Sequence, residues 1–214
     1  MRRLCVAALV LLVLASCGDG DAVPIARVQI PGGAEVVIST PTPRSPRGRA
    51  LGALAQAEDL VLYSVEAYSP PKMPGPRPDH DRTLTEAYDR AESEALDRSY
   101  KAWCTREPCL HRNRILGQTP VRVAADRAAV LTALRESLGQ VPDYASACVP
   151  EYRHAVTFTA DGHRYDVLLC YRCGQVAVAI DGEIGFDEQT WKMGEEGALN
   201  AILTRARIPL APKW

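Results

Sequence analysis

The sequence feature that most constrains the fold is a stretch of alternating apolar residues between positions 156 and 180. An apolar side chain at every second position is the pattern of a strand that buries one face. Asp161-Gly162 lies between the first two runs and is a strong signal for a hairpin turn. Residues 170–174 can turn the second run into the third. The pattern predicts a three-stranded antiparallel meander, with buried positions at Val156, Phe158, Tyr165, Val167, Leu169, Val176, Val178 and Ile180.

Three segments carry helical signals. A Thr-x-x-Glu capping box at Thr83 opens a helix with a narrow, alanine-rich apolar stripe, which places this helix on the outside of the fold. Residues 127–138 have a stronger apolar face, and Gly139 follows at the position of a C′ glycine, so we expect this helix to contribute most to the core. A last helix, over about 195–206, has acidic residues in its first turn and a basic residue near its end, which matches the helix dipole.

The remaining patterns complete the fold class. A short helix from residue 50 runs into a strand at 60–67, and a further strand lies around 115–117. Residues 70–105 form an insertion that consists of a proline-rich loop and the outer helix. These elements predict an α+β fold, in which an antiparallel sheet ends in the three-stranded meander and helices pack mainly on one face. We expect residues 50–214 to form a single globular domain.

The N-terminus has the organisation of an export signal. Arg2 and Arg3 precede an apolar run over residues 4–15, which is well short of the roughly 20 residues that a spanning helix needs. A basic start, a short apolar run and small residues are typical of a cleaved signal peptide, here residues 1–16. The segment Leu14-Ala15-Ser16-Cys17 resembles the lipobox of bacterial prolipoproteins. This resemblance implies that the Cys17 thiol carries a lipid and that Cys17 becomes the first residue of the mature protein.

Lipidation at Cys17 would make a membrane the first partner of the chain. Each buried CH₂ of an acyl chain contributes about 0.8 kcal/mol, so several chains hold a protein firmly while its domain stays in water. Gly18, rather than an aspartate, follows the cysteine. In a Gram-negative cell envelope this favours the periplasmic face of the outer membrane. The alternatives are an ordinary signal peptide with an unmodified Cys17, or an uncleaved anchor.

Residues 17–49 are predicted to form the lipidated cysteine and a flexible tether. Two adjacent glycines and three closely spaced prolines favour extended, polyproline-like chain, which separates a domain from the bilayer. The exception is the apolar segment 34–39, which could form a short edge strand.

Charge and motifs exclude several classes of function. The formal net charge is −1, and nucleic-acid binders show a basic face, so nucleic acid is not an expected partner. The sequence contains no Gly-x-Ser-x-Gly elbow, no phosphate-binding glycine loop and no His-Glu-x-x-His motif. We expect a non-enzymatic binding or structural module whose partner is an envelope protein or ligand, although the sequence leaves an enzymatic role open.

Cysteines suit an exported domain, because disulfides persist in oxidising compartments. Five cysteines follow Cys17, and an odd number cannot all pair within one chain. We expect a local Cys104–Cys109 bridge and a second bridge within the set Cys148, Cys170 and Cys173, which leaves one thiol. On this interpretation no cofactor is expected.

The alternative function is metal binding or thiol chemistry. Cys170-x-x-Cys173 followed by glycine resembles a zinc knuckle, and Cys148 and His154 could complete a tetrahedral site. Cys104 and Cys109 could offer two further ligands. Redox-active thiols are the remaining possibility, but thioredoxin-like activation needs the first cysteine at a helix N-terminus, whereas strand follows strand here.

Five segments of the mature chain together resemble a set of uncharacterised bacterial exported proteins. The resemblance covers residues 50–210 loosely, implies one continuous domain and indicates no activity. Relative to that set, the proline loop and helix at 70–105 look like an insertion. The segments are residues 62–64, 114–119, 148–154, 167–173 and 208–210.

Overall fold

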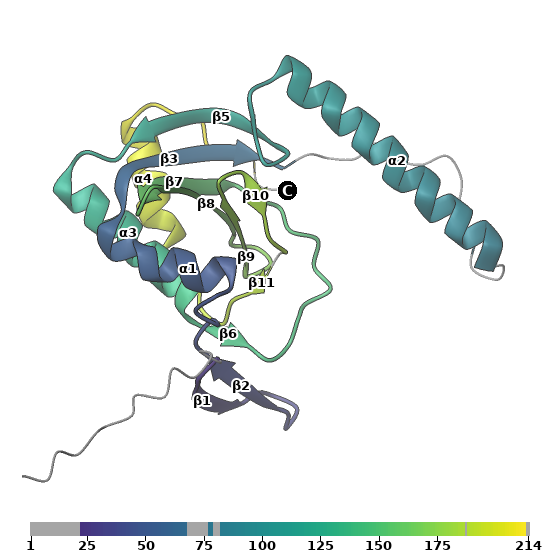
Figure 1. The fold of residues 1–214 in the computed structure, drawn as a ribbon, viewed down its shortest axis with the longest axis horizontal. Coiled ribbons are helices and arrows are strands. Elements are labelled where there is room, and N and C mark those ends of the chain that lie inside the picture. Colours follow the sequence, from purple (N-terminus) through teal and green to yellow (C-terminus); the bar gives the residue numbers. More distant parts are fainter. Residues whose placement is uncertain (1–21, 68–76, 79–81, 187, 213–214) are drawn as a thin grey trace, which may run out of the picture.

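The computed structural model describes residues 22–67, 77–78, 82–186 and 188–212. It confirms the α+β class: an antiparallel sheet of eight strands carries helices on one face, and a smaller sheet lies beside it (Figure 1). The strand order is β10-β9-β8-β7-β3-β5-β4, and β11 also pairs with β9. The strands are β3 (Glu58–Glu66), β4 (Cys109–Leu110), β5 (Asn113–Pro120), β7 (His154–Ala160), β8 (His163–Cys170), β9 (Gln175–Ile180), β10 (Glu183–Ile184) and β11 (Glu188–Gln189).

The predicted meander is present as β7, β8 and β9. Asp161 and Gly162 form the β7–β8 turn with left-handed backbone angles of +52° and +78° in φ, as a two-residue hairpin turn requires. The register pairs Phe158 with Tyr165, and their rings stack with centroids 4.9 Å apart. The alternation recognised in the sequence therefore produces the central part of the sheet.

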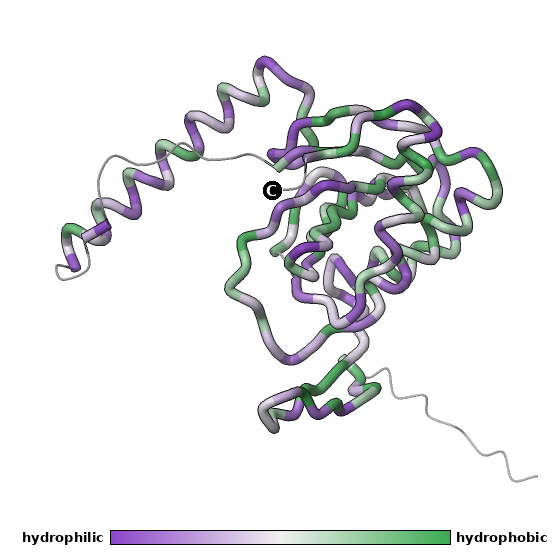
Figure 2. Tube along the Cα trace, turned by 180° about the vertical axis from the view of Figure 1, so that it is seen from behind, coloured by the Kyte–Doolittle hydropathy of each residue, from purple (hydrophilic) through white to green (hydrophobic). Residues whose placement is uncertain are grey.

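Three helices cover the face of the sheet to which these alternating residues point. They are α1 (Pro46–Ala53), α3 (Ala124–Gly139) and α4 (Glu196–Arg205), and their apolar residues form the main core with Leu62, Val156 and Leu169. Figure 2 shows the hydrophobic segments concentrated in this body. The predicted C′ role of Gly139 is wrong: it is the last residue of α3, and the chain leaves through Gln140 in an extended conformation.

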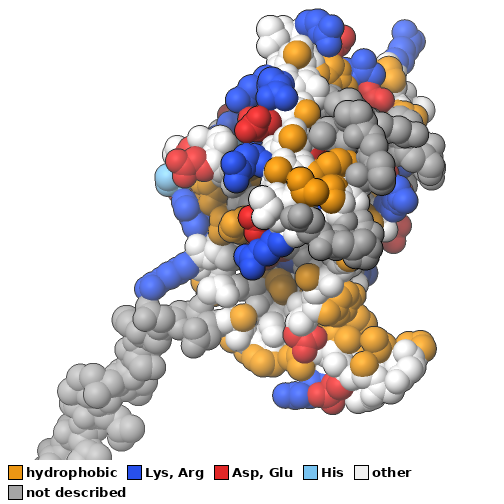
Figure 3. All heavy atoms as spheres, turned by 90° about the vertical axis from the view of Figure 1, so that its right-hand side faces the viewer, with side chains coloured by type: hydrophobic (Ala, Val, Ile, Leu, Met, Phe, Trp, Pro, Cys, Tyr) orange, Lys and Arg blue, Asp and Glu red, His pale blue; other side chains and the backbone are white. Residues whose placement is uncertain are grey.

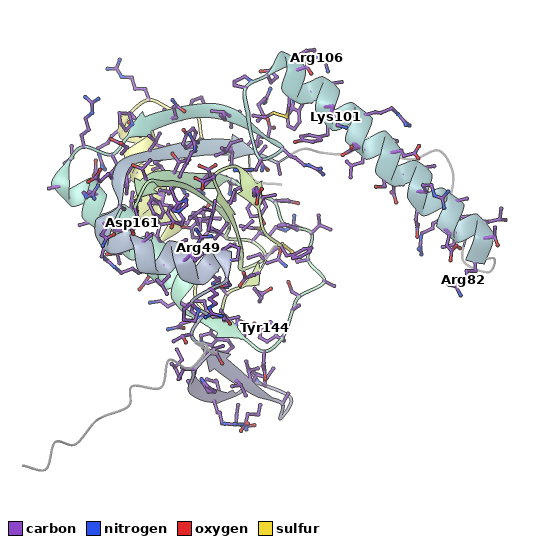
Figure 4. The ribbon with its side chains drawn as sticks, viewed as in Figure 1. Arg49, Arg82, Lys101, Arg106, Tyr144 and Asp161 are labelled. Atoms are coloured by element: carbon purple, nitrogen blue, oxygen red, sulfur yellow. A yellow bond between two sulfur atoms is a disulfide. The ribbon has the colours of Figure 1, made fainter. Side chains whose placement is uncertain are left out.

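Helix α2 (Arg82–Arg106) extends away from the body, as the narrow apolar stripe predicted (Figure 1). None of its residues is buried. Arg82, Lys101 and Arg106 mark its length in Figure 4. Its C-terminal end is joined to the sheet by the predicted Cys104–Cys109 disulfide, with the two Cα atoms 5.4 Å apart.

The prediction of a flexible tether over residues 17–49 is wrong for residues 24–29 and from residue 46 onward, whereas the short strand expected over 34–39 is present. Strands β1 (Pro24–Gln29), β2 (Glu35–Ser39) and β6 (Val141–Pro142) form the smaller sheet, in which β2 is central rather than an edge strand. Val36 and Ile38 give β2 a buried side, which outweighs the nearby glycines and prolines. Residues 1–16 and Cys17 lie outside the described residues, so the signal and lipidation predictions stay predictions.

Helix α1 also begins inside the predicted tether. Ser45 caps it by accepting a hydrogen bond from the Gly48 amide at 3.0 Å, and Pro46 occupies the first turn, which are both established start signals. The ordered domain therefore begins before residue 50.

Arg47 is a fully buried arginine that joins α1 to the end of α3. Its Nε donates to the Leu138 carbonyl at 2.8 Å, and its Nη2 donates to the carbonyls of Ser137 and Gln140 at 2.9 Å. Its Nη1 donates to the Gln189 carbonyl at 2.7 Å. The last carbonyls of a helix have no partner within the helix, so this guanidinium supplies the donors that the C-terminus of α3 lacks.

We predict that Arg47→Met lowers the free energy of unfolding by about 3–5 kcal/mol, because two buried and two partly buried carbonyls lose a charged donor. Burial lowers the pKa of Arg47 to about 10, an effect that Glu188 opposes, so the side chain stays charged at neutral pH. Urea unfolding measures the loss. Arg49→Met is the matched control, since Arg49 is exposed on the same helix and should change stability by no more than about 0.5 kcal/mol. Equal effects of the two substitutions would contradict the assigned role.

Candidate functional site

A cavity of about 480 Å³ opens between α2, the β4–β5 turn and two loops of the body. Its lining is mainly apolar, and two of its residues are highly exposed: Phe186 at 94 % and Val149 at 81 %. Figure 3 views the molecule from the α2 side and shows hydrophobic side chains exposed there among charged ones. Large exposed apolar side chains around a hollow are typical of a binding site. The apolar lining includes Leu96, Tyr100, Pro150, Tyr152 and Ile184.

Both disulfides lie directly beside the walls of this cavity. Cys109 precedes the lining residue His111 by two positions and is bonded to Cys104 at the end of α2. Cys148 directly precedes Val149 and is bonded to Cys173, with the Cα atoms 5.7 Å apart. One bridge within the set Cys148, Cys170 and Cys173 was predicted, and Cys170 is left as a buried free thiol.

The β4–β5 turn contributes His111 and Arg112, which both have left-handed backbones with φ of +43° and +73°. The β7–β8 and β9–β10 turns have the same length and use Asp-Gly at both places. A left-handed residue other than glycine, asparagine or aspartate costs roughly 1–2 kcal/mol. Such strain is often found at functional sites, and both of these residues line the cavity.

His111 is fixed by a buried carboxylate. Its Nε2 lies 2.7 Å from Oδ2 of Asp166, while Arg164 Nε donates to the other carboxylate oxygen at 2.8 Å. Burial raises the pKa of Asp166, but the hydrogen bonds from His111 and Arg164 outweigh it and hold this pKa below its usual value. Asp166 is therefore a charged acceptor that orients the imidazole. Asn113 secures the turn by donating to the His111 carbonyl at 2.8 Å.

Arg112 connects the turn to α2. Its guanidinium carbon lies 4.7 Å from the centroid of the Tyr100 ring, and its Nη2 is 3.4 Å from an Asp97 carboxylate oxygen. A cation above an aromatic face is attracted by the ring quadrupole. The cavity consequently has apolar walls and a basic side chain held in place at its rim.

The structure brings together three of the four proposed metal ligands, the cysteines, but not His154, and two of these cysteines are bonded to each other, which speaks against the metal alternative. Cys148 and Cys173 are consumed by a disulfide. His154 pairs with Leu169 in the β7–β8 register, so it faces the helix side, whereas the next residue, Cys170, faces the opposite side. Within the described ranges, no three His, Cys, Asp or Glu side chains are grouped to hold a metal ion.

His154 instead has a structural environment beneath α4. Its Nε2 lies 2.8 Å from Oδ1 of Asn200, and its ring meets Tyr171 edge-on at 5.4 Å between centroids. Burial lowers the pKa of His154, so the imidazole is neutral at pH 7. A buried, neutral, hydrogen-bonded histidine contributes to packing rather than to metal binding.

The sequence analysis did not single out His111, Arg112 or Phe186, because no known catalytic or ligand motif includes them. A usable signal was present at the first two: His-Arg stands directly after the disulfide candidate Cys109 and directly before a strand, where a turn residue was to be expected. Phe186 carries no comparable local signal.

Comparisons with protein-family models, with curated proteins and with solved structures found no match. In the part of the chain that the structure describes, no helix has both the length and the apolar character needed to cross a bilayer. The geometry of the site therefore carries the functional argument.

We predict that Arg112→Gly stabilises the protein by about 0.5–1 kcal/mol, since glycine adopts the left-handed turn conformation without strain. The exposed contacts of Arg112 with Tyr100 and Asp97 offset only part of this gain. Thermal unfolding measures the change. Arg122→Gly, at an exposed position with no left-handed backbone, is the control and should not stabilise. A loss of stability in Arg112→Gly would show that the turn is not strained.

Proposed function

We propose that this chain is an envelope lipoprotein, anchored through lipid at Cys17, whose domain is a non-enzymatic binding module. The cavity beside the β4–β5 turn is its binding site. Two intrachain disulfides support an exported location, because such bonds persist in oxidising compartments. The periplasmic face of the outer membrane is the expected place in a Gram-negative envelope.

The observation that carries the binding function is an apolar cavity whose walls are fixed covalently. Its volume of about 480 Å³ is within the usual range for small-molecule and anchor-residue sites. Phe186 and Val149 remain exposed, although burying such side chains would be favourable. An apolar ligand or partner side chain would recover that energy, and Arg112 at the rim favours one that also carries an anionic group.

The polar groups of the cavity support binding rather than covalent catalysis. His111 is engaged by Asp166, and among the described residues that line the cavity there is no serine, threonine or cysteine to act as a nucleophile beside it. The lining polar groups thus serve to orient a ligand.

The binding site is tested with 8-anilinonaphthalene-1-sulfonate, a probe that is both aromatic and anionic. We predict that the native protein binds it, and that Val149→Asp weakens binding at least about tenfold by placing a negative charge in the apolar wall. Val123→Asp is the matched control, because Val123 is also exposed, at 61 %, but does not line the cavity. Fluorescence titration measures both. Equal affinity of the two variants would reject the cavity as the site.

The anchor is tested by Cys17→Ser. We predict that this substitution removes lipidation and releases the protein from membranes, since the lipid on the Cys17 thioether would provide the attachment. Fractionation after a high-salt wash, together with mass spectrometry of the N-terminal peptide, measures the change. If the variant still sediments with membranes, the lipoprotein proposal fails while the binding proposal is unaffected.

A further inference from the structure

Three cysteines lie together where the β8–β9 turn contacts the segment that follows Cys148. Cys148 and Cys173 are bonded, and Cys170 is the remaining free thiol in the described chain. Cys170 Sγ accepts hydrogen bonds from the Cys173 amide at 3.4 Å and from the Glu151 amide at 3.2 Å. The Cys170 thiol is thus held next to both chain segments that the disulfide joins. One amide donor is that of Cys173 itself, and the other, that of Glu151, lies three residues after Cys148.

We infer that these cysteines form a thiol–disulfide exchange site in which Cys170 displaces Cys148. The Cys170 thiol gives up a proton, which is returned to Cys148 as that cysteine leaves, and the Cys170 thiolate attacks Sγ of Cys173. A Cys170–Cys173 bond forms as the Cys148–Cys173 bond breaks, and Cys148 leaves as a thiolate that takes up a proton. The step exchanges one disulfide for another, so it needs no oxidant or reductant.

The direction of the exchange follows from the positions of the three cysteines. Cys170 and Cys173 belong to the same short turn, and Cys170 already touches the Cys173 backbone. Cys148 is half-buried, whereas Cys170 and Cys173 are both buried. A leaving thiolate is better solvated at the surface, which favours Cys148 as the leaving group over Cys173.

The exchange changes the cavity as well as the disulfide. Cys148 directly precedes Val149, so breaking its bond releases the wall to which Val149 and Pro150 belong. It also presents a reactive thiol beside the mouth of the cavity. The cysteine cluster thereby acts as a modification site for thiol-reactive molecules that reach this mouth. This modification site does not depend on whether the cavity binds an apolar ligand.

The test is labelling of the full mature chain, purified in mild detergent without reductant. The native protein is treated with N-ethylmaleimide, then denatured and treated with a second, heavier maleimide, and peptides are analysed without reduction. We expect the first label on Cys148 and a Cys170–Cys173 bridge, with faster labelling at about pH 8.5 than at about pH 6.5 because the thiolate is the attacking species. Native label on Cys173, or label on Cys170 only after denaturation with Cys148–Cys173 intact, would overturn the proposal.

Two variants make the result independent of labelling efficiency. Cys170→Ser removes the attacking thiol, so native labelling of Cys148 should be lost. Cys148→Ser should contain a Cys170–Cys173 disulfide, and two free thiols there would show that the turn cannot accommodate the exchanged bond. Both cysteines of the Cys104–Cys109 bridge are bonded, so this bridge serves as the internal control and should stay unlabelled in every sample.

Discussion

The structure depends on the buried guanidinium of Arg47. Its donors reach carbonyls at the end of α3 and at Gln189 in β11, so one side chain joins α1, α3 and the edge of the large sheet. The Gln140 carbonyl also accepts from Thr190 Oγ1 and from the Trp191 amide, and β6 of the small sheet follows it in the chain. Each unpaired buried carbonyl would cost of the order of 1–3 kcal/mol. The relative placement of both sheets is therefore set by polar contacts around one charge, and the apolar core packs within the frame they define.

Successive side chains of strand β8 point to opposite faces of the sheet, so its core residues and its polar and thiol residues lie on different faces. Tyr165, Val167 and Leu169 face the helices and belong to the main core, whereas the intervening residues face the other side. Asp166, which holds His111, and Cys170, which lies against the disulfide, are both among the latter. The carboxylate that orients His111 and the free thiol beside the disulfide thus lie on the same face of one strand. The same parity explains why His154 cannot join the cysteines, although it is close to them in sequence.

The sequence patterns correctly predicted those elements that are determined by interactions between residues close together in the chain. The meander follows from alternation and from Asp161-Gly162, and α2 lies outside because its stripe is too narrow to be buried. Residues 24–39 were mistaken for a tether because, although β1 and β2 pair locally, β2 is joined to the rest of the fold through β6, about a hundred residues away in the chain. The cavity was missed for the same reason: His111 and Asp166 are separated by 55 residues. Disulfide pairing was predicted in part. The odd number of cysteines showed that at least one stays unpaired, but only the tertiary structure shows that Cys148 is bonded to Cys173 rather than to Cys170.

The two disulfides differ in what they stabilise. Cys104–Cys109 closes a separation of five residues and mainly fixes the angle at which α2 leaves the sheet. Cys148–Cys173 spans 25 residues, and a loop of that length corresponds to about 3–4 kcal/mol of chain entropy in the unfolded state. The wall it holds has little packing of its own, as the exposure of Val149 shows. The Cys148–Cys173 bond therefore fixes this wall in place, as packed apolar side chains fix the segments of the core. The position of the wall depends on which two of the three sulfurs are bonded.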